Sequence, residues 1–469
     1  MSRPQLPSAP PRAVHTDSPG PRAREMLATG QLDMQAIYRL LVVDDEKSQG
    51  CSLVDVDGNV YLDLFSHFAL GALGYNHPDL MAVASSPSFA RAAANPTSSP
   101  FCPGTQWFEF LEGIQRYAPA GMTKIYCVDA GGEGTEAALK AAFIVHGERR
   151  RQAAGGPKNP LELPLSQQEA ILANAGSDAV SVSLSGAFHG RGFGSLTMTH
   201  SKTIHKADIP AFGWPIAPFP ANRFPLERYA DENAAAEAAA LAELARVFDA
   251  YAGRVASLMV EPMQSEGGDR HASPAFYRAV QQMCQDAGAA FILDEVQTGG
   301  GISGTLWTHQ QFDLPRPPDL MCFGKKMQLG GFFATPDYNI TQFGRMYQTR
   351  NGDRARGLLA LKTMQVIERD GLLDNVRTLG AYLLHRLEAL SAAFPTLVTE
   401  PRGRGFLLAF DLPTTALRDE FLKRALRRGV FGTYTGSRSV RLRPHLILTE
   451  ADAREACDVF DAVAREMSA

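Results

Sequence analysis

The sequence predicts an α/β fold with a mainly parallel, helix-covered sheet. Two observations predict it: short runs that are apolar throughout, typical of strands buried on both faces, and helical segments that alternate with those runs. With 469 residues, 45% of them hydrophobic and 20% charged, the chain is long enough for two or three domains with a large shared core.

The expected elements follow in chain order. Two short strands occupy Leu53–Leu64, around a turn at Asp57 and Gly58. Further strands, with the loops that follow them, are expected at Lys124–Gly132, Ala179–Gly190, Val255–Gln264, Ala289–Gly301 and Asp319–Lys326. Helices are expected between them at Glu133–His146, Asn233–Tyr251 and Ser273–Gly288.

The organisation of the chain predicts a tail and two domains. Met1–Arg24 is rich in Pro, Ser and Arg and lacks an apolar core, so a flexible tail is favoured over an organelle transit peptide. Beyond Tyr347 helices dominate, and residues 401–412 and 439–448 supply a smaller sheet. We therefore expect a tail at 1–17, an N-terminal part of a small α/β domain at 18–75, a large domain at 76–346 and the C-terminal part of the small domain at 347–469.

Charge and composition exclude several classes of partner. The formal net charge is -4 and the pI is near 6.3, whereas nucleic-acid-binding proteins normally carry a basic excess. No stretch approaches the roughly 18 uninterrupted apolar residues of a membrane span. The six cysteines show neither CxxC nor Cys/His spacing, so we expect a reducing, cytoplasmic location without a disulfide framework, and no metal site.

Residues suited to chemistry stand at the carboxyl ends of the expected strands, where ligands of open α/β sheets bind. They are Gly131 and Gly132, Phe188 to Arg191, Glu261, Asp294 and Glu295 with Gln297, and Lys325 and Lys326. Together they match what pyridoxal phosphate needs: a phosphate cradle, a platform for the ring, a carboxylate at the pyridine nitrogen and an amine.

Each match has a plainer alternative. Gly131 and Gly132 end a strand and open a helix, whose positive end suits a phosphate, although two glycines alone more often form an ordinary turn. Asp294 follows five apolar residues and needs a cationic partner, which a helix cap or a core salt bridge would also provide. Phe188 suits the ring platform, although an aromatic residue at a strand end is more often core.

Lys325 and Lys326 compete for the role of the reactive amine. Burial beside a cationic site can make a lysine amine nucleophilic. Spacing alone does not choose between the two neighbours.

Several longer runs are far more specific, among them LGYNHP, GAFHGR, THSKTIHKADIPAFGWPIAPFP, EPMQSEGGDRHAS, DEVQTGGGISG, FGKKMQLGGFF and VRLRP. Through these runs the sequence resembles the class III (ω-) aminotransferases of fold type I, and among these the animal-type 4-aminobutyrate aminotransferases. The resemblance extends from about Ser18 to the end of the sequence. The resemblance implies pyridoxal phosphate as cofactor, a large domain with a smaller one, and a homodimer with active sites at the interface.

The resemblance also implies roles for single residues. It selects Lys325 as the lysine that binds the cofactor covalently. The other cofactor contacts would be Phe188 on the ring, Asp294 at the pyridine nitrogen, Gln297 near the ring hydroxyl, Gly131 and Gly132 at the phosphate, and Thr349 at the phosphate of the neighbouring subunit.

Three residues match the substrate-binding positions of these enzymes. Arg191 would bind the carboxylate distal to the reacting amine, and Arg441 the α-carboxylate of glutamate and 2-oxoglutarate. Glu266 would pair with Arg441 when the substrate has no α-carboxylate. Arginine suits both sites because its planar guanidinium can bind a carboxylate through two parallel hydrogen bonds. Without the surrounding motifs, a surface or structural ion pair would be the favoured interpretation of Arg191 and Arg441.

The sequence departs from the animal enzymes in three respects. Ala130 and Glu133 replace two cysteines that hold an iron–sulfur cluster, so we expect no cluster. Gly132 replaces a serine that supports the phosphate. Arg350 replaces a tryptophan, and Phe68 replaces a smaller aliphatic residue of the substrate pocket.

The implied activity is transfer of the terminal amino group of 4-aminobutyrate to 2-oxoglutarate, which gives succinate semialdehyde and glutamate. An L-lysine 6-aminotransferase or another ω-amino acid transaminase is the close alternative, and a catalytically silent subunit with this fold is a more distant one. The expected partners are these small molecules and a second copy of the chain, without nucleic acid or membrane.

Overall fold

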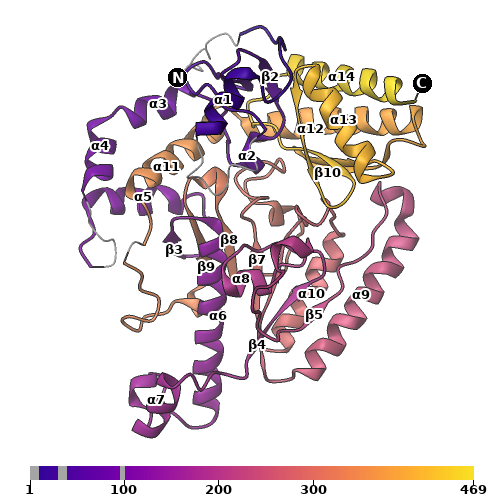
Figure 1. The fold of residues 1–469 in the computed structure, drawn as a ribbon. Helices are drawn as coiled ribbons and strands as arrows, with labels where there is room; N and C mark the ends of the chain where they lie inside the picture. Colours follow the sequence, from indigo (N-terminus) through magenta and orange to yellow (C-terminus); the bar gives the residue numbers. More distant parts are fainter. Residues whose placement is uncertain (1–9, 30–39, 96–100, 350, 469) are drawn as a thin grey trace. The chain divides into compact units, whose positions relative to one another are not determined.

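The computed structural model describes residues 10–29, 40–95, 101–349 and 351–468, in two compact units (Figure 1). The first unit comprises Met1–Arg91, Gly300–Leu306 and Leu358–Ala469, and the second comprises Ala92–Gly299 and Trp307–Gly357. Two of the boundaries lie inside helices α4 (Pro87–Ala94) and α11 (Arg354–Arg369), whereas we expected boundaries near residues 75 and 346, and the other two flank Gly300–Leu306.

The large sheet belongs to the second unit and has the strand order β3-β9-β8-β7-β6-β4-β5. Its strands are β3 (Lys124–Val128), β4 (Val180–Leu184), β5 (Ile216–Ala217), β6 (Val255–Val260), β7 (Ala290–Asp294), β8 (Leu320–Phe323) and β9 (Gly330–Ala334). Strand β9 runs antiparallel to both of its neighbours, β3 and β8, and the other pairs are parallel. All strands except β9 therefore end at one edge, and the predicted mainly parallel sheet is confirmed.

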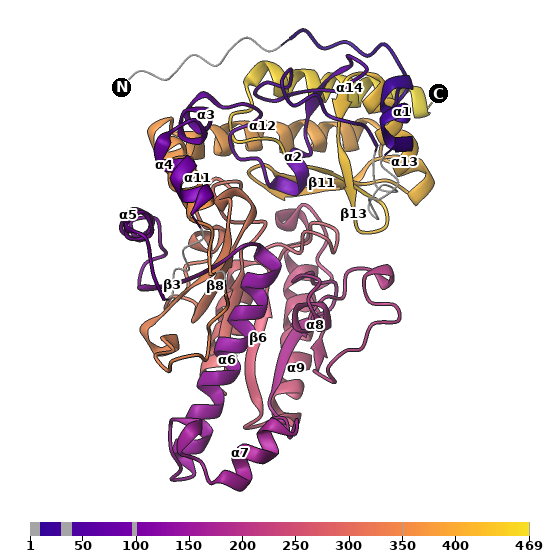
Figure 2. The same ribbon diagram turned by 60° about the vertical axis from the view of Figure 1, so that its left-hand side comes forward.

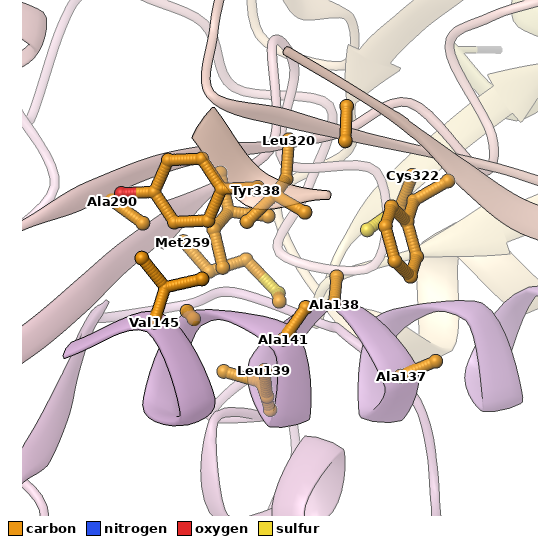
Figure 3. Packing of buried hydrophobic residues seen from close by; sticks show 14 of the residues in the cluster. Ala137, Ala138, Leu139, Ala141, Val145, Met259, Ala290, Leu320, Cys322 and Tyr338 are labelled. Atoms are coloured by element: carbon orange, nitrogen blue, oxygen red, sulfur yellow. The ribbon is translucent and has the colours of Figure 1, made fainter. Parts of the chain in front are cut away.

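Helix α6 (Gly131–Ala153) packs along one face of this sheet (Figure 2). Small side chains on α6 let the helix approach the strands closely. Figure 3 shows Ala138, Ala141 and Val145 of α6 directed toward Met259 and Ala290 of the sheet. Successive strand residues point to opposite faces, so the buried neighbours of Ala290 face the other side, where α10 (Pro274–Asp286) contacts β7. The second unit also contains α5 (Thr105–Gln115), α7 (Leu165–Leu172), α8 (Phe193–Thr197) and α9 (Ala230–Ala250).

The first unit combines the two ends of the chain, as expected for the smaller α/β domain. The predicted hairpin is present as β1 (Ser52–Val54) and β2 (Val60–Asp63), and β2 pairs in parallel with β12 (Val430–Phe431). A second, antiparallel sheet has the order β10-β11-β14-β13, with β10 (Thr399–Arg404), β11 (Leu407–Asp411), β14 (Ser439–Leu442) and β13 (Thr433–Thr435). The helices are α1 (Pro21–Thr29), α2 (Ser66–Ala69), α3 (Pro78–Ala84), α12 (Leu372–Ala393), α13 (Thr415–Arg427) and α14 (Glu450–Ser468).

We expected a flexible tail at residues 1–17, and residues 10–17 of this segment make contacts with distant parts of the chain. The backbone N–H of His15 donates to Asn59 Oδ1 over 2.7 Å, and Arg12 forms an ion pair with Glu455 of α14 at 2.7 Å. These long-range contacts hold the segment against the first unit. Residues 1–9 lie outside the described part of the chain. No helix among the described residues is long and apolar enough to cross a membrane.

Candidate active site

The strand ends of the large sheet converge on one pocket in the second unit. The pocket is lined by Gly131, Gly132, Phe188, His189, Gly190, Glu261, Ser265, Asp294, Val296, Gln297, Thr298 and Lys325. These residues lie at or just beyond the ends of β3, β4, β6, β7 and β8, which share one edge of the sheet. Every cofactor-binding residue predicted from the sequence, except Thr349, therefore lines the same pocket.

Asp294 ends the buried strand β7 and is itself 5% exposed. Its Oδ2 lies 2.8 Å from His189 Nδ1, and its Oδ1 accepts a hydrogen bond of 3.0 Å from the backbone N–H of Val296. The backbone N–H of His189 donates in turn to Thr199 Oγ1 over 3.0 Å. Both carboxylate oxygens are thus held, and the group is pre-oriented at the pocket wall.

Glu261 follows β6 and supports the segment that carries Phe188. Its Oε1 accepts from the backbone N–H of Phe188 at 2.9 Å, and its Oε2 accepts from that of Ser265 at 3.1 Å. Burial, and then the negative charge of Asp294, raise the pKa of Glu261 well above its usual range.

The structure separates the two lysines that the sequence left in competition. Lys326 is 1% exposed, and its Nζ donates to the backbone oxygen of Gln297 over 2.8 Å. Lys325 is only partly buried and lines the pocket. Its backbone has a φ of +49°, a left-handed conformation that non-glycine residues adopt mainly where function or packing requires it. The geometry therefore favours Lys325 as the reactive amine.

The start of α6 forms a cradle for an anion. Its N-cap residue, Ala130, has no capping side chain, so the first N–H groups of the helix can meet a ligand. A Cβ on Gly131 would lie 2.4 Å from Val296 Cγ1, whereas a Cβ on Gly132 would meet only Gly190 Cα at 3.9 Å. Glycine is therefore required at 131, and position 132 has room for a side chain.

This set of groups fits pyridoxal phosphate. The helix N-terminus suits the phosphate, Phe188 offers an aromatic face, and the held carboxylate of Asp294 suits a protonated ring nitrogen. Lys325 supplies an amine in the same pocket.

Two predicted substrate-binding residues lie close to this pocket. The Arg191 guanidinium lies 5.9 Å from the centre of the Phe188 ring. Glu266 directly follows the pocket residue Ser265, and its Oε2 lies 3.0 Å from Lys202 Nζ. Lys202 was not predicted, because nothing in the sequence indicates which cation meets Glu266.

Arg441 lies on β14 of the first unit and is fully buried. Its guanidinium lies 5.1 Å from the centre of the Phe68 ring. Phe68 belongs to an unusual turn, since Ser66 to Ala69 all have positive φ values, from 41° to 64°. Each left-handed L-residue costs about 1–2 kcal/mol, so the surrounding contacts must hold this turn. One of them is the hydrogen bond from Ser66 Oγ to the backbone oxygen of Arg443, at 2.5 Å.

The remaining predicted positions lie away from the pocket or outside the described residues. Thr349 is exposed and is not part of the pocket lining. Arg350 lies outside the described residues. Glu133, at one of the replaced cysteine positions, accepts a hydrogen bond from the backbone N–H of Asp129 at 3.1 Å. Within the described part of the chain, no group of three or more His, Cys, Asp or Glu side chains is arranged to hold a metal ion.

Comparison with known proteins agrees with this geometry. The family Aminotransferase class-III matches residues 34–464. The mitochondrial 4-aminobutyrate aminotransferase of Mus musculus is 37% identical over 96% of this chain and 90% of its own length, and the 4-aminobutyrate aminotransferase of Emericella nidulans is 37% identical over 99% and 93%. A solved structure of a lysine aminotransferase from M. tuberculosis superposes with a TM-score of 0.82 at 33% identity, over 94% of this chain and 98% of that one. The chain therefore belongs to the class-III aminotransferases and is a pyridoxal-phosphate-dependent transaminase.

Proposed function

We propose that the protein transfers the terminal amino group of 4-aminobutyrate to 2-oxoglutarate, giving succinate semialdehyde and glutamate. The observation that carries the proposal is the likeness, over nearly the whole chain, to proteins named for this activity. The arginine beside the Phe188 ring supports it, since both amino donors, 4-aminobutyrate and glutamate, carry a carboxylate distal to the reacting amine.

Lys325 and Asp294 have separate tasks in this proposal. When bound, the cofactor supplies an electron sink for the bond that breaks at the amine-bearing carbon. Lys325 Nζ moves the proton to and from that carbon. The Asp294 carboxylate, held by His189 and Val296, keeps the proton on the ring nitrogen.

Three charged side chains bind the carboxylates of the two substrates, and two of them distinguish one substrate from the other. Arg191 binds the distal carboxylate, which 4-aminobutyrate and glutamate share. Arg441 binds the α-carboxylate, which only glutamate and 2-oxoglutarate carry. Glu266 supplies the missing negative charge when 4-aminobutyrate is the substrate. A bidentate guanidinium suits both carboxylate sites.

We also propose a homodimer in which Thr349 reaches the cofactor phosphate of the neighbouring subunit. Thr349 is exposed, and the nearby aromatic side chains of Phe343 and Tyr347 are 89% and 40% exposed. Both rings pack edge-on against Phe101, itself 57% exposed, and an exposed aromatic cluster of this kind is typical of an interface. Mixing inactive Lys325→Ala and Thr349→Ala chains tests this arrangement, because a mixed dimer would regain one intact site. A mixture that stays inactive although mixed dimers form would contradict it.

The likeness to the solved lysine aminotransferase favours L-lysine 6-aminotransferase activity as a second candidate. This activity would require the pocket to accept an α-amino acid head group near Arg191. A panel of 4-aminobutyrate, β-alanine, lysine and ornithine, each with 2-oxoglutarate, separates the candidates by the rate of glutamate formation. We expect 4-aminobutyrate to give the highest kcat/KM, and a higher value for lysine would overturn the proposal.

A further inference from the structure

The loop that carries Arg191 is held at both ends by consecutive residues of helix α6. At one end, Thr135 Oγ1 donates to the backbone oxygen of His189 over 2.6 Å. At the other end, the backbone N–H of Ser195 donates to Glu136 Oε1 over 2.8 Å. All of these residues belong to the second unit, so the loop and its two anchors form part of one compact body.

Glu136 caps helix α8, which begins directly after the loop. The N-cap residue of α8, Gly192, has no side chain that could accept a hydrogen bond from the helix. The Glu136 carboxylate instead accepts from one of the N–H groups that the first turn of a helix leaves unpaired. A Cβ on Gly192 would lie 2.5 Å from Glu136 Oε1, and a Cβ on Gly194 would lie 2.7 Å from Glu136 Oε2. The two glycines therefore make room for the carboxylate of Glu136.

The Arg191 guanidinium depends on this backbone for its direction. Among the residues that the structure describes, Arg191 has no ion-pair partner, and its guanidinium lies over the Phe188 ring, 5.9 Å from the ring centre. Recognition of a carboxylate through two parallel hydrogen bonds requires a fixed orientation of the guanidinium. Misplacement of a binding group by about 1 Å can cost roughly 100-fold in rate, so a shift of the loop would impair carboxylate recognition.

We infer that Glu136 is a positioning residue that sets the direction of Arg191, and with it the recognition of the substrate carboxylate distal to the reacting amine. The inference deepens the proposed function and rests on it, because it presupposes that Arg191 binds this carboxylate. Glu136 acts through Ser195 and the backbone of the loop, without contact with the substrate.

Single-turnover reaction of the cofactor-loaded protein with two amines tests this role. 4-Aminobutyrate carries the distal carboxylate, whereas butan-1-amine has a methyl group in its place. We expect Glu136→Ala to lower the second-order rate constant for 4-aminobutyrate by about tenfold, and to leave the rate constant for butan-1-amine within about twofold. The affinity for pyridoxal phosphate, measured by absorbance titration, should be unchanged, because Glu136 does not line the pocket.

Three further variants relate the effect to the Glu136 carboxylate. Glu136→Gln should restore the reaction with 4-aminobutyrate, because the amide oxygen can still accept from the backbone N–H of Ser195. Gly194→Ala should reproduce the loss, because the added Cβ would displace Glu136 Oε2. Glu133→Ala is the matched control, since this carboxylate lies one turn earlier on α6 and accepts from the backbone N–H of Asp129. It should leave the reactions of both amines unchanged.

The Arg191→Ala background separates an action through Arg191 from a general effect on the fold. In that background, Glu136→Ala should have no further effect on the reaction with 4-aminobutyrate. A further loss there, or equal losses for the two amines when only Glu136 is replaced, would overturn the inference. Failure of the proposed function is a different result, namely no glutamate from 4-aminobutyrate and 2-oxoglutarate with the unaltered protein.

Discussion

His189 Nδ1 lies 2.8 Å from Asp294 Oδ2, and both side chains are buried. The two residues are 105 positions apart: His189 follows β4 and Asp294 ends β7, and these strands are separated in the sheet by β6. The histidine fixes the orientation of the carboxylate that faces the cofactor ring nitrogen in the proposed mechanism. It acts on the chemistry through Asp294 and is a positioning residue.

Substitution of His189 should therefore weaken cofactor binding as well as turnover. A hydrogen bond to a charged group contributes about 1.5–3 kcal/mol, so we expect His189→Phe to reduce pyridoxal phosphate affinity by about 10- to 100-fold. His189→Asn, which can still donate an amide N–H, should lose less. Titration of the apoprotein with cofactor, followed by absorbance, measures the change. Equal affinity in the Phe variant and the unaltered protein would show that the pair has no such role.

The phosphate cradle predicts opposite outcomes for the same substitution at neighbouring positions. Gly132→Ser introduces a hydroxyl where the nearest atom to the new Cβ is 3.9 Å away, and one added hydrogen bond of about 1 kcal/mol would tighten cofactor binding about fivefold. Gly131→Ser would force a Cβ to 2.4 Å from Val296 Cγ1 and should weaken binding strongly. Cofactor dissociation constants of both variants test this, and weaker binding in Gly132→Ser would contradict the geometry.

The roles proposed for the charged side chains predict a split between the half-reactions. Glu266→Ala should slow the 4-aminobutyrate half-reaction far more than the glutamate half-reaction, by about 100-fold for a stranded buried charge. Arg441→Ala should show the reverse preference, and Arg191→Ala should impair both. Single-turnover kinetics measures each half-reaction separately. Equal losses for Glu266→Ala would mean that this residue only supports the fold.

His200 predicts a loss of stability in mild acid. Burial, and then the positive charge of Lys206, lower the pKa of His200 from 6.5 to about 4. Between pH 6.5 and pH 4, the unfolded chain binds a proton at His200 that the folded chain does not bind. The neutral His200 ring therefore contributes fully to the free energy of unfolding above pH 6.5, and this contribution is lost as the pH falls toward 4. Because the ring is partly exposed, we expect the free energy of unfolding to be about 1 kcal/mol lower at pH 5 than at pH 7.

Urea unfolding at pH 7 and pH 5 measures this effect. His200→Asn should lose less free energy of unfolding on acidification than the unaltered protein. The matched control is His385→Asn, at an exposed position on α12. If the His200 and His385 variants respond equally to acid, His200 is not the group responsible.

The sequence predicts the fold well where local pattern and topology agree. Short, mainly apolar runs identify β3, β4, β6, β7 and β8, and because parallel strands end at one edge, the residues after them are expected to lie together. Strand β9 was not expected, since its glycines and phenylalanines carry no distinct strand pattern. It pairs antiparallel between β3 and β8, which only the folded sheet reveals.

Several features of the site depend on contacts between distant segments. The strand ends contain His189 and Glu261, but sequence position does not indicate that one holds Asp294 and the other the backbone of Phe188. The choice between Lys325 and Lys326 depends on the backbone turn at Lys325, where φ is +49°, and on the hydrogen bond from Lys326 Nζ to the backbone oxygen of Gln297. The composition of residues 10–17 predicts a tail and gives no sign of their long-range contacts with Asn59 and Glu455.

Reduction of the cofactor-loaded protein with borohydride, followed by peptide mapping, tests the central assignment most directly. If Lys325 is the reactive amine of the pocket, the pyridoxyl group will be found on Lys325 and Lys326 will be unmodified. Lys325→Ala should abolish the adduct while Lys326→Ala, which removes the hydrogen bond to Gln297, should retain it. An adduct on Lys326 of the unaltered protein, or none on either lysine, would contradict the account.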